Sequence, residues 1–186
     1  MNLTLNYLST GINLFLLLLF SIPAFSQQPT SPLEASFQNY RKMKAETPYK
    51  LDWITLGPVV NSARADVVQV DPKNPSTMYA GFGSGGLWKT TNNGITWKSI
   101  FEEQSSIGIG DVELAPSNPN IIYLGTGENL KKPRNFTLPG TGMFRSDDAG
   151  TTWNSIGLED SWSIAEIEIH PTNPETVFVA VLGHLW

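Results

Sequence analysis

The chain has 186 residues, with 17 acidic and 12 basic side chains and a formal net charge of −5. This balance argues against a nucleic-acid-binding protein, which normally shows a basic patch and a high pI. The sequence contains no Cys and only two His, which excludes disulfides, a Cys nucleophile and thiolate metal sites and argues against a His-rich metal site. We therefore expect no metal, no cofactor and no nucleic-acid partner.

The segment that ends at Ser26 has the pattern of a secretory signal peptide. Leu14–Phe20 is a run of consecutive apolar residues, which is too short to span a bilayer core of ~30 Å. Small residues at Ala24 and Ser26 form a cleavage site, although no Lys or Arg precedes the run. We expect cleavage after Ser26 and a secreted or extracytoplasmic protein, in the periplasm or at the cell surface, with no membrane span left. An uncleaved N-terminal anchor is the alternative.

Residues 27–50 form a polar segment between the signal peptide and the main domain. Ser31–Glu34 has the spacing of a capping box, with Pro at the first helical position. Apolar residues then share one helical face: Leu33, Phe37 and Tyr40. This pattern predicts a short amphipathic helix that ends near Lys44 and packs on the outside of the main domain.

From Trp53 onward the chain repeats a pattern. A turn of the form D/A/H-P-x-N-P recurs at Asp71–Pro75, Ala115–Pro119 and His170–Pro174. The third turn follows the second at a longer interval than the second follows the first, because of an insert near residues 129–141. Repeats of about 40–50 residues built from strands and turns indicate a propeller or a similar array.

Each repeat is predicted to hold four short strands. In the first repeat they are Val67–Val70, Met78–Gly81, Gly86–Thr90 and Thr96–Ile100, rich in β-branched and aromatic residues and bounded by Pro, Asn and Gly. Their short connections allow only an antiparallel meander, and tandem four-stranded meanders are propeller blades. The predicted fold is all-β, a β-propeller with about two and a half blades within residues 51–186.

That number of blades is lower than a closed propeller needs. Trp53–Gly57 matches Trp153–Gly157 and is interpreted as a lone fourth strand ahead of the first blade. Propellers close with ~4–8 blades, so we expect the remaining blades to lie C-terminal to residue 186. Open strand edges favour association with other chains, and the 186-residue chain alone is therefore expected to aggregate or to melt broadly.

A second repeated motif marks the turn between the third and fourth strands. It has the form S/T-x-D/N-x-G-x-T-W and occurs at residues 90–97 and 146–153. The Asp or Asn side chain can accept hydrogen bonds from the backbone that follows it, Gly supplies a positive φ, and Trp buries apolar area against the next blade. We assign structural roles, far from any ligand, to the motif residues: Thr90, Asn92, Gly94, Thr96, Trp97, Ser146, Asp148, Gly150, Thr152 and Trp153.

With these motifs in register, the sequence resembles the Asp-box propellers, also called bacterial neuraminidase repeats, over about residues 53–186. The surrounding segments G-G-L-W-K-T and A-P-S-N-P-x-I-I-Y-x-G-T-G-E are similar to sortilin-like and glycosidase-like secreted propellers. The resemblance implies that the Asp-box lies away from the ligand face. Its members include sialidases, xyloglucan hydrolases and sorting receptors, so it implies a fold more than an activity. Ala63-Arg64 departs from the Gly-Arg that is usual there.

Alternate loops of a meander lie on opposite faces, so the D-P-x-N-P turns and the Asp-boxes are predicted to share one face. The opposite face collects the other loops, which include the insert at residues 128–141, and loops on a rigid scaffold often carry function. The candidate ligand residues on that face are Arg64, Asp66, Glu128, Arg134 and Trp162. An Arg can hold a carboxylate bidentately, and Glu128 could accept sugar hydroxyls or form half of a carboxylate pair. A structural Arg64–Glu128 ion pair near the central channel is the alternative.

Three functions remain open. The first is a secreted or cell-surface binding module that engages a protein or peptide through this loop face. The second is a glycoside hydrolase-like enzyme of the sialidase or xyloglucanase type, whose catalytic carboxylates lie partly beyond residue 186. The third is a structural module of a surface assembly. No catalytic residue can be assigned from the sequence.

Overall fold

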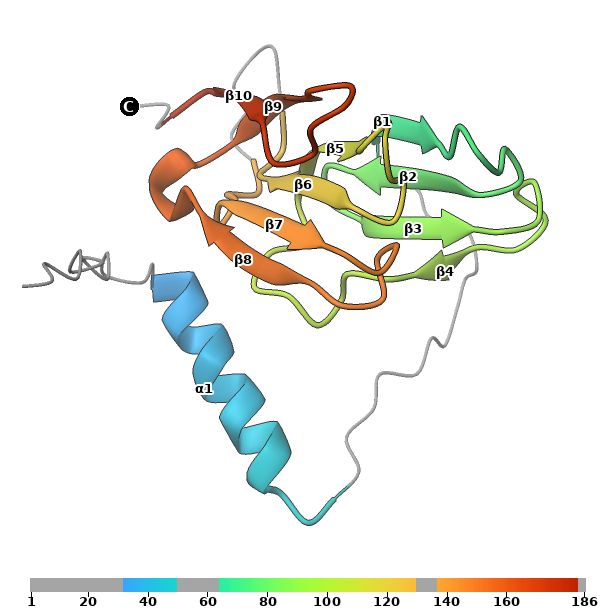
Figure 1. Cartoon of the computed structure of the whole chain (residues 1–186). Helices are drawn as coiled ribbons and strands as arrows, with labels where there is room; N and C mark the ends of the chain where they lie inside the picture. The colour runs from blue at the N-terminus through green and yellow to red at the C-terminus, as the bar shows by residue number, and fades with distance from the viewer. Residues whose placement is uncertain (1–31, 50–63, 130–136, 184–186) are drawn as a thin grey trace, which may run out of the picture.

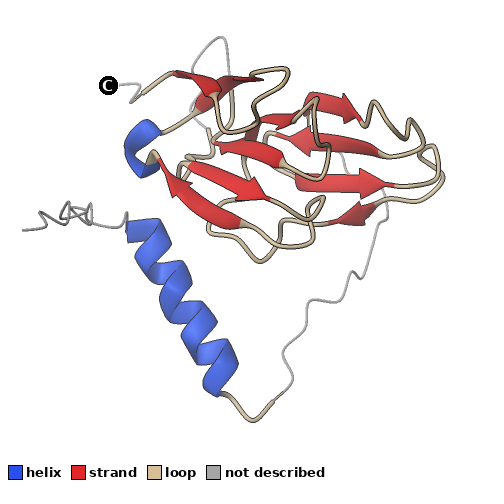
Figure 2. Ribbon diagram, in the orientation of Figure 1, coloured by secondary structure: helices blue, strands red, loops and turns tan. Residues whose placement is uncertain are grey.

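The computed structural model describes residues 32–49, 64–129 and 137–183. The predicted signal peptide at 1–26, the predicted strand at 53–57 and Arg134 lie outside these ranges. The described strands form two four-stranded antiparallel sheets, β1-β2-β3-β4 and β5-β6-β7-β8, and a two-stranded sheet, β9-β10 (Figures 1 and 2). The strands are β1 (Ala65–Val70), β2 (Met78–Phe82), β3 (Gly86–Thr90), β4 (Lys98–Ser99), β5 (Ile109–Leu114), β6 (Ile122–Thr126), β7 (Met143–Ser146), β8 (Asn154–Gly157), β9 (Ile164–Ile169) and β10 (Val177–Val181).

This architecture confirms the predicted all-β fold of propeller blades, two complete and one half-complete. We refer to the three sheets in chain order as blades one, two and three. The predicted strands of the first blade overlap the observed ones throughout. The last of them, β4, begins at Lys98 rather than at Thr96. Thr96 still belongs to the preceding turn, because its N–H donates to the Asn92 side chain at 3.0 Å.

Equivalent strands of the blades pair in the same register. In blade one Val68 faces Ala80, and in blade two Val112 faces Leu124. Each first strand also carries a bulge near the same end, between residues 65 and 67 in β1 and between 109 and 111 in β5. The pairing of β9 with β10 shifts at the corresponding place. The repeat in the sequence therefore corresponds to a repeat of strand pairing and bulges in the structure.

The apolar core lies between the blades. One buried cluster joins blades one and two and includes Leu87, Phe101, Val112, Leu124 and Phe144. A second cluster joins blades two and three around Ile121, Met143, Ile164 and Ile167. Blade two is consequently covered on both of its faces, as neighbour packing in repeat arrays requires.

The two hairpin turns at residues 90–97 and 146–153 have the predicted geometry. Asp148 Oδ1 accepts the N–H groups of Thr151 and Thr152 at 3.0 and 2.8 Å, and Gly150 has a φ of 86°. The Ser146 hydroxyl accepts the Gly150 N–H at 2.8 Å and donates to Asp148. These two bonds explain why the first position of the motif is Ser or Thr, which the sequence pattern alone does not.

The predicted packing direction of the motif Trp is wrong. Trp153 packs against the preceding blade, not the next one: its ring meets Phe101 edge-on at 5.2 Å, and its Nε1–H donates to the Ile100 carbonyl at 3.0 Å. Phe101 follows β4 and packs edge-on against Phe144 of blade two at 5.2 Å, so the end of blade one is the surface that the turn of blade two reaches. Trp97, the equivalent residue of blade one, is 39% exposed.

A single α-helix among the described residues, α1 (Pro32–Glu46), precedes the blades. It extends past the predicted end at Lys44 and buries no residue. In Figure 1 it lies apart from the sheets, and Lys44 reaches Glu103 in an ion pair of 2.7 Å. The helix thus meets the blades through charge and not through the apolar face that was expected to pack. Within the described ranges, no helix has the length and hydropathy needed for a membrane span.

Candidate functional site

The structure separates two faces at opposite ends of the strands. On the first, the hairpin turns lie beside the D-P-x-N-P turns, because Asn93 N–H donates to Ser76 and Ala149 N–H donates to Asn120. We call this the turn face. At the other end, Gly83 N–H donates to the Arg64 carbonyl and Gly127 N–H to the Gly108 carbonyl. We call that end, with Arg64, Asp66, Gly83, Glu128 and residues 138–141, the loop face. The predicted division of loops between faces agrees with these contacts.

Asp66 occupies the bulge at the loop-face end of β1. The register places it between Ala65 and Val67, without a pairing partner. Bulges re-aim side chains and are frequent next to active sites. The equivalent residue in blade two is Gly110, where a Cβ would collide with the Ile164 carbonyl, and in blade three it is Ala165. Among the three blades, only blade one presents a functional group at this position.

Glu128 joins blade two to blade one across the loop face. It follows β6, is 5% exposed, and forms an ion pair with the Arg64 guanidinium. Its other oxygen, Oε2, accepts the Leu138 N–H at 3.4 Å. Both carboxylate oxygens therefore have partners, which a buried charge requires. The Arg64–Glu128 ion pair, weighed as a structural alternative from the sequence, is present.

Gly83 makes room for two carboxylates at this point. A Cβ at Gly83 would lie 2.5 Å from Asp66 Oδ2 and 3.1 Å from Glu128 Oε1. The two carboxylate oxygens therefore flank the same small space beside the Gly83 backbone. Any side chain at Gly83 would displace at least one of them, which gives the Gly a steric role specific to this site.

The pKa of Asp66 is raised from its ordinary value. Its partial burial disfavours the charged form, and the positive charge of Arg64 opposes this effect without cancelling it. Arg64 itself keeps 48% of its side chain exposed while its guanidinium is anchored on Glu128. The arrangement offers a half-exposed cation, a partly desolvated carboxyl group and a buried carboxylate within one small area.

Trp162, another predicted site residue, reaches the loop face through its backbone. It follows the short 3-10 helix η1 (Glu159–Ser161) and has an unusual φ of 61°. Its carbonyl accepts the Gly140 N–H at 2.7 Å. The structure therefore gives Trp162 a part in holding the loop at residues 138–141, while Arg134, the remaining candidate, lies outside the described residues.

Sequence reasoning did not bring together a group of carboxylates on the first strands of blades two and three, although Asp111 was one of the carboxylates expected on or near the ligand face. Asp111 and Glu113 on β5 lie near Glu166 and Glu168 on β9, and the Gln69 side chain of β1 donates to Glu113. Burial, followed by the charges of Asp111, Glu168 and Glu166, raises the pKa of Glu113 to about 7. The signal was available in the sequence as acidic residues at alternate positions of equivalent strands.

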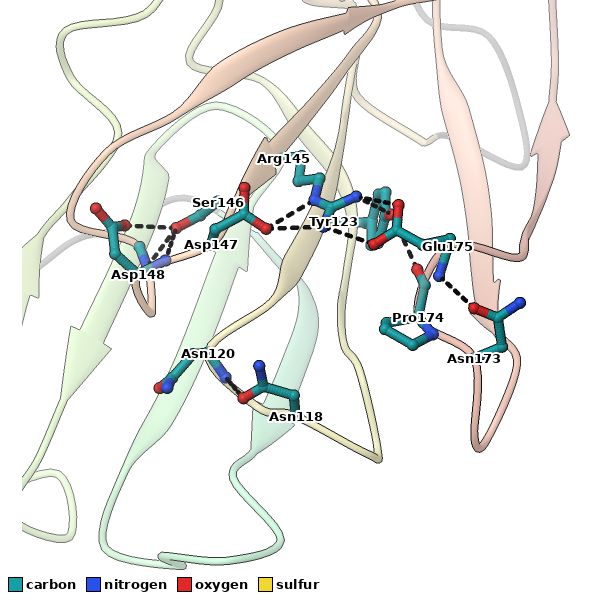
Figure 3. A network of polar contacts seen from close by, with 11 residues as sticks. Asn118, Asn120, Tyr123, Arg145, Ser146, Asp147, Asp148, Asn173, Pro174 and Glu175 are labelled. Carbon is teal, nitrogen blue, oxygen red and sulfur yellow. Dashed lines mark hydrogen bonds and ion pairs between the residues drawn. The ribbon is translucent and has the colours of Figure 1, made fainter.

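A second polar network lies on the turn face between blades two and three (Figure 3). Arg145 of β7 binds Glu175 through two nitrogens at 2.7 and 2.9 Å and also contacts Asp147 and the Tyr123 hydroxyl. The Tyr123 hydroxyl donates to the Pro174 carbonyl at 2.9 Å. All of these groups have partners, and we interpret the network as a connection between blades.

In the described part of the chain, no cluster of three or more His, Asp or Glu side chains could hold a metal ion. The acidic residues near Glu113 are among the described residues, and they do not form such a cluster.

Comparisons with known proteins give partial likenesses. No protein-family model matches the sequence, and no curated protein matches it. Among solved structures, a GH74 enzyme of Niastella koreensis is 27% identical with a TM-score of 0.48, over 61% of this chain and 16% of that one. An ancestral GH74 enzyme is 20% identical, with a TM-score of 0.48, over 62% and 16%. A GH74 xyloglucanase from Xanthomonas campestris is 18% identical, with a TM-score of 0.42, over 57% and 17%.

The chain thus spans about a sixth of the length of these enzymes. Their TM-scores all lie below 0.5.

Proposed function

We propose that this chain is part of an exported propeller that binds a ligand through its loop face, with Arg64 as the anion-binding group. One observation supports the proposal: Arg64 is half exposed, and its guanidinium is held in place by an ion pair with the buried Glu128. An Arg fixed in this way loses little side-chain freedom on binding, because a preorganised group has less entropy to lose.

The ligand that fits is a protein or peptide that presents a carboxylate. A guanidinium has five N–H donors, so one contact with Glu128 leaves donors for a second carboxylate. Glu128 is less suited to direct ligand contact, because its two oxygens are taken by Arg64 and Leu138. Its role in this proposal is to hold Arg64 and to join the loops of blades one and two.

A glycoside hydrolase-like activity is the second candidate, and one observation favours it. Carboxylate oxygens of Asp66 and Glu128 flank one small space beside Gly83, which is compatible with the ~5–5.5 Å that separates the two carboxyl groups of retaining glycosidases. The raised pKa of Asp66 suits a general acid. The burial of Glu128, which is 5% exposed, weighs against this candidate, since a nucleophile or base must reach the substrate.

A binding experiment tests the proposal. A fluorescent tetraglutamate peptide is titrated with the chain and its anisotropy is followed, with Arg64→Gln as the variant and Arg41→Gln in α1 as the matched control. We expect Arg64→Gln to weaken binding about tenfold, the effect of losing a hydrogen bond to a charged group, and Arg41→Gln to change nothing. Equal affinity in the wild type and Arg64→Gln would refute the proposal. Release of sugar from xyloglucan that Asp66→Asn abolishes would instead establish the hydrolase.

The proposal also includes export. Mass analysis of the protein recovered outside the cytoplasm should give an N-terminus at Gln27, the residue after the predicted cleavage site. Recovery of soluble protein with Met1 intact would contradict this part.

A further inference from the structure

A groove on the turn face separates blade one from the hairpin turn of blade two. Its cavity has a volume of about 470 Å³ and lies between β4 and the turn at residues 149–151. Cavities of this size are in the range of small-molecule sites. The groove lies at the opposite end of the strands from Arg64 and Asp66, and the function proposed above makes no use of it.

Two lysines line the groove and repel each other. Lys89 of β3 is partly buried, and its Nζ donates to the Ala149 carbonyl at 2.8 Å. Burial lowers the pKa of Lys89 and the nearby charge of Lys98 lowers it further, whereas Asp71 and Asp148 oppose both effects. Lys98 is exposed. An anionic group between the two ammonium groups would be attracted by both, in addition to the attraction that Asp71 and Asp148 already exert on Lys89.

An aromatic ring lies beside these charges. Trp97 was predicted from the sequence to be structural and far from any ligand, but it lines the same groove and is 39% exposed. Its equivalent in blade two, Trp153, is enclosed by Phe101 and Ile100. An exposed Trp offers a flat apolar face that adds contact area at little cost in side-chain freedom. The rest of the lining carries hydroxyl groups at Thr91, Thr96, Ser99 and Thr151, together with Ile100 and the carboxylate of Glu102.

Cations, a flat ring and hydroxyl groups together select a particular kind of ligand. The cations suit a carboxylate, the ring suits the apolar face of a pyranose, and the hydroxyls suit a molecule that carries many hydroxyls. An extended acidic peptide fits less well, because strand addition needs a long free edge and the edge strand here, β4, has two residues. We propose that this groove binds an acidic sugar, with its carboxylate between Lys89 and Lys98 and its ring on Trp97.

The test is a titration of the exported protein, with its remaining blades, with trigalacturonate, in which calorimetry measures the affinity. The main variant is Lys98→Gln, chosen because this side chain is exposed and has no role in the core, and the matched control is Lys42→Gln in α1. We expect Lys98→Gln to weaken binding about tenfold, as for the loss of one charge-assisted contact. Lys98→Arg should retain most of the affinity. Added salt should weaken binding by the wild type, because screening reduces attraction between exposed charges.

Three further comparisons separate this site from others. Neutral trigalactose should bind at least tenfold more weakly than trigalacturonate, and Arg64→Gln should leave trigalacturonate affinity unchanged. Loss of trigalacturonate affinity in Arg64→Gln, together with its retention in Lys98→Gln, would place the ligand on the loop face. That result would overturn this inference while supporting the anion-binding role of Arg64. Absence of trigalacturonate binding would also overturn it. The inference would also be overturned if Lys98→Gln weakened the binding of tetraglutamate by the same factor as the binding of trigalacturonate. That result would identify a peptide site.

Discussion

Blades one and two have the same strand order and the same register, yet they differ in how their residues are covered. Val68 and Val112 hold equivalent places on β1 and β5, but Val68 is 59% exposed and Val112 only 1%. The two Trp of the hairpin turns differ in the same sense, since Trp97 is exposed and Trp153 is packed on Phe101.

The difference teaches that a blade does not bury its own residues. A four-stranded sheet has two faces, and each face is covered only by a neighbouring sheet. Blade two has blade one on one side and blade three on the other. Equivalent residues of the two blades therefore contribute very different amounts to the free energy of unfolding. Paired substitutions can measure that difference.

The largest difference is expected for the two tryptophans. Trp153→Ala should lower the free energy of unfolding by about 3–5 kcal/mol, because it removes a large aromatic side chain that is packed against Phe101. Trp97→Ala should cost about 1 kcal/mol, since less apolar area is withdrawn from water. Urea denaturation followed by circular dichroism measures both. Equal losses in the two variants would show that Trp97 is as well covered as Trp153 and would remove the contrast.

The valines give a second and smaller contrast. Val112→Ala should cost about 2 kcal/mol, for lost burial and a small cavity between blades one and two. Val68→Ala, at the equivalent exposed position, should change stability by no more than about 0.5 kcal/mol. The same urea titration measures both variants. A cost at Val68 similar to that at Val112 would contradict the view that position among the blades sets the burial.

A third contrast concerns pH, because blade two has Glu113 where blade one has Gln69. The pKa of Glu113 is raised to about 7 in the folded chain, mainly by burial. The folded state then holds the proton more tightly than the unfolded state, so this stabilisation is complete below about pH 4.5 and is lost as pH rises to about 7. We expect the Tm to fall over that window.

The matched variant is Glu113→Gln, which gives β5 the residue of β1 and removes the titration. Its Tm should vary less between pH 5 and pH 7.5 than that of the wild type, as measured by calorimetry in buffers of constant ionic strength. A wild-type Tm that rises over this window, or an identical pH dependence in both proteins, would count against the role of Glu113.

The smallest effect is expected in the hairpin turns, where blade two has Asp148 and blade one has Asn92. Hydrogen bonds from Thr152 and Ser146 hold the pKa of Asp148 down to about 2. Its contribution is present above pH 3.8 and is lost as pH falls through about 2. Because Asp148 is exposed and solvent screens its charge, Asp148→Asn should cost less than about 1 kcal/mol at pH 7, and acid titration of both proteins measures it. A cost as large as that of Val112→Ala would show a role beyond the turn.

Much of the fold could be predicted from the sequence, because its signals are local. The strand pattern, the Gly at residue 150 and the oxygen of Asp148 each act on backbone within a few residues, so their geometry follows from residue type and spacing. The candidate site was predicted only in part. Arg64, Asp66 and Glu128 come together as a group, but the sequence gives no indication that Asp66 sits on a bulge or that Gly83 makes room for two carboxylates.

The sequence by itself determined the repeat, the strand order within each blade and the division of loops between two faces, because alternation and short connections leave one antiparallel solution. Only the tertiary structure decided which Trp is enclosed, which Val is buried and which carboxyl groups are desolvated. Those properties depend on the distance between residues of different blades, such as Trp153 and Ile100 or Glu113 and Glu168. Neighbours in different blades lie far apart along the chain, and no local pattern encodes how closely they approach.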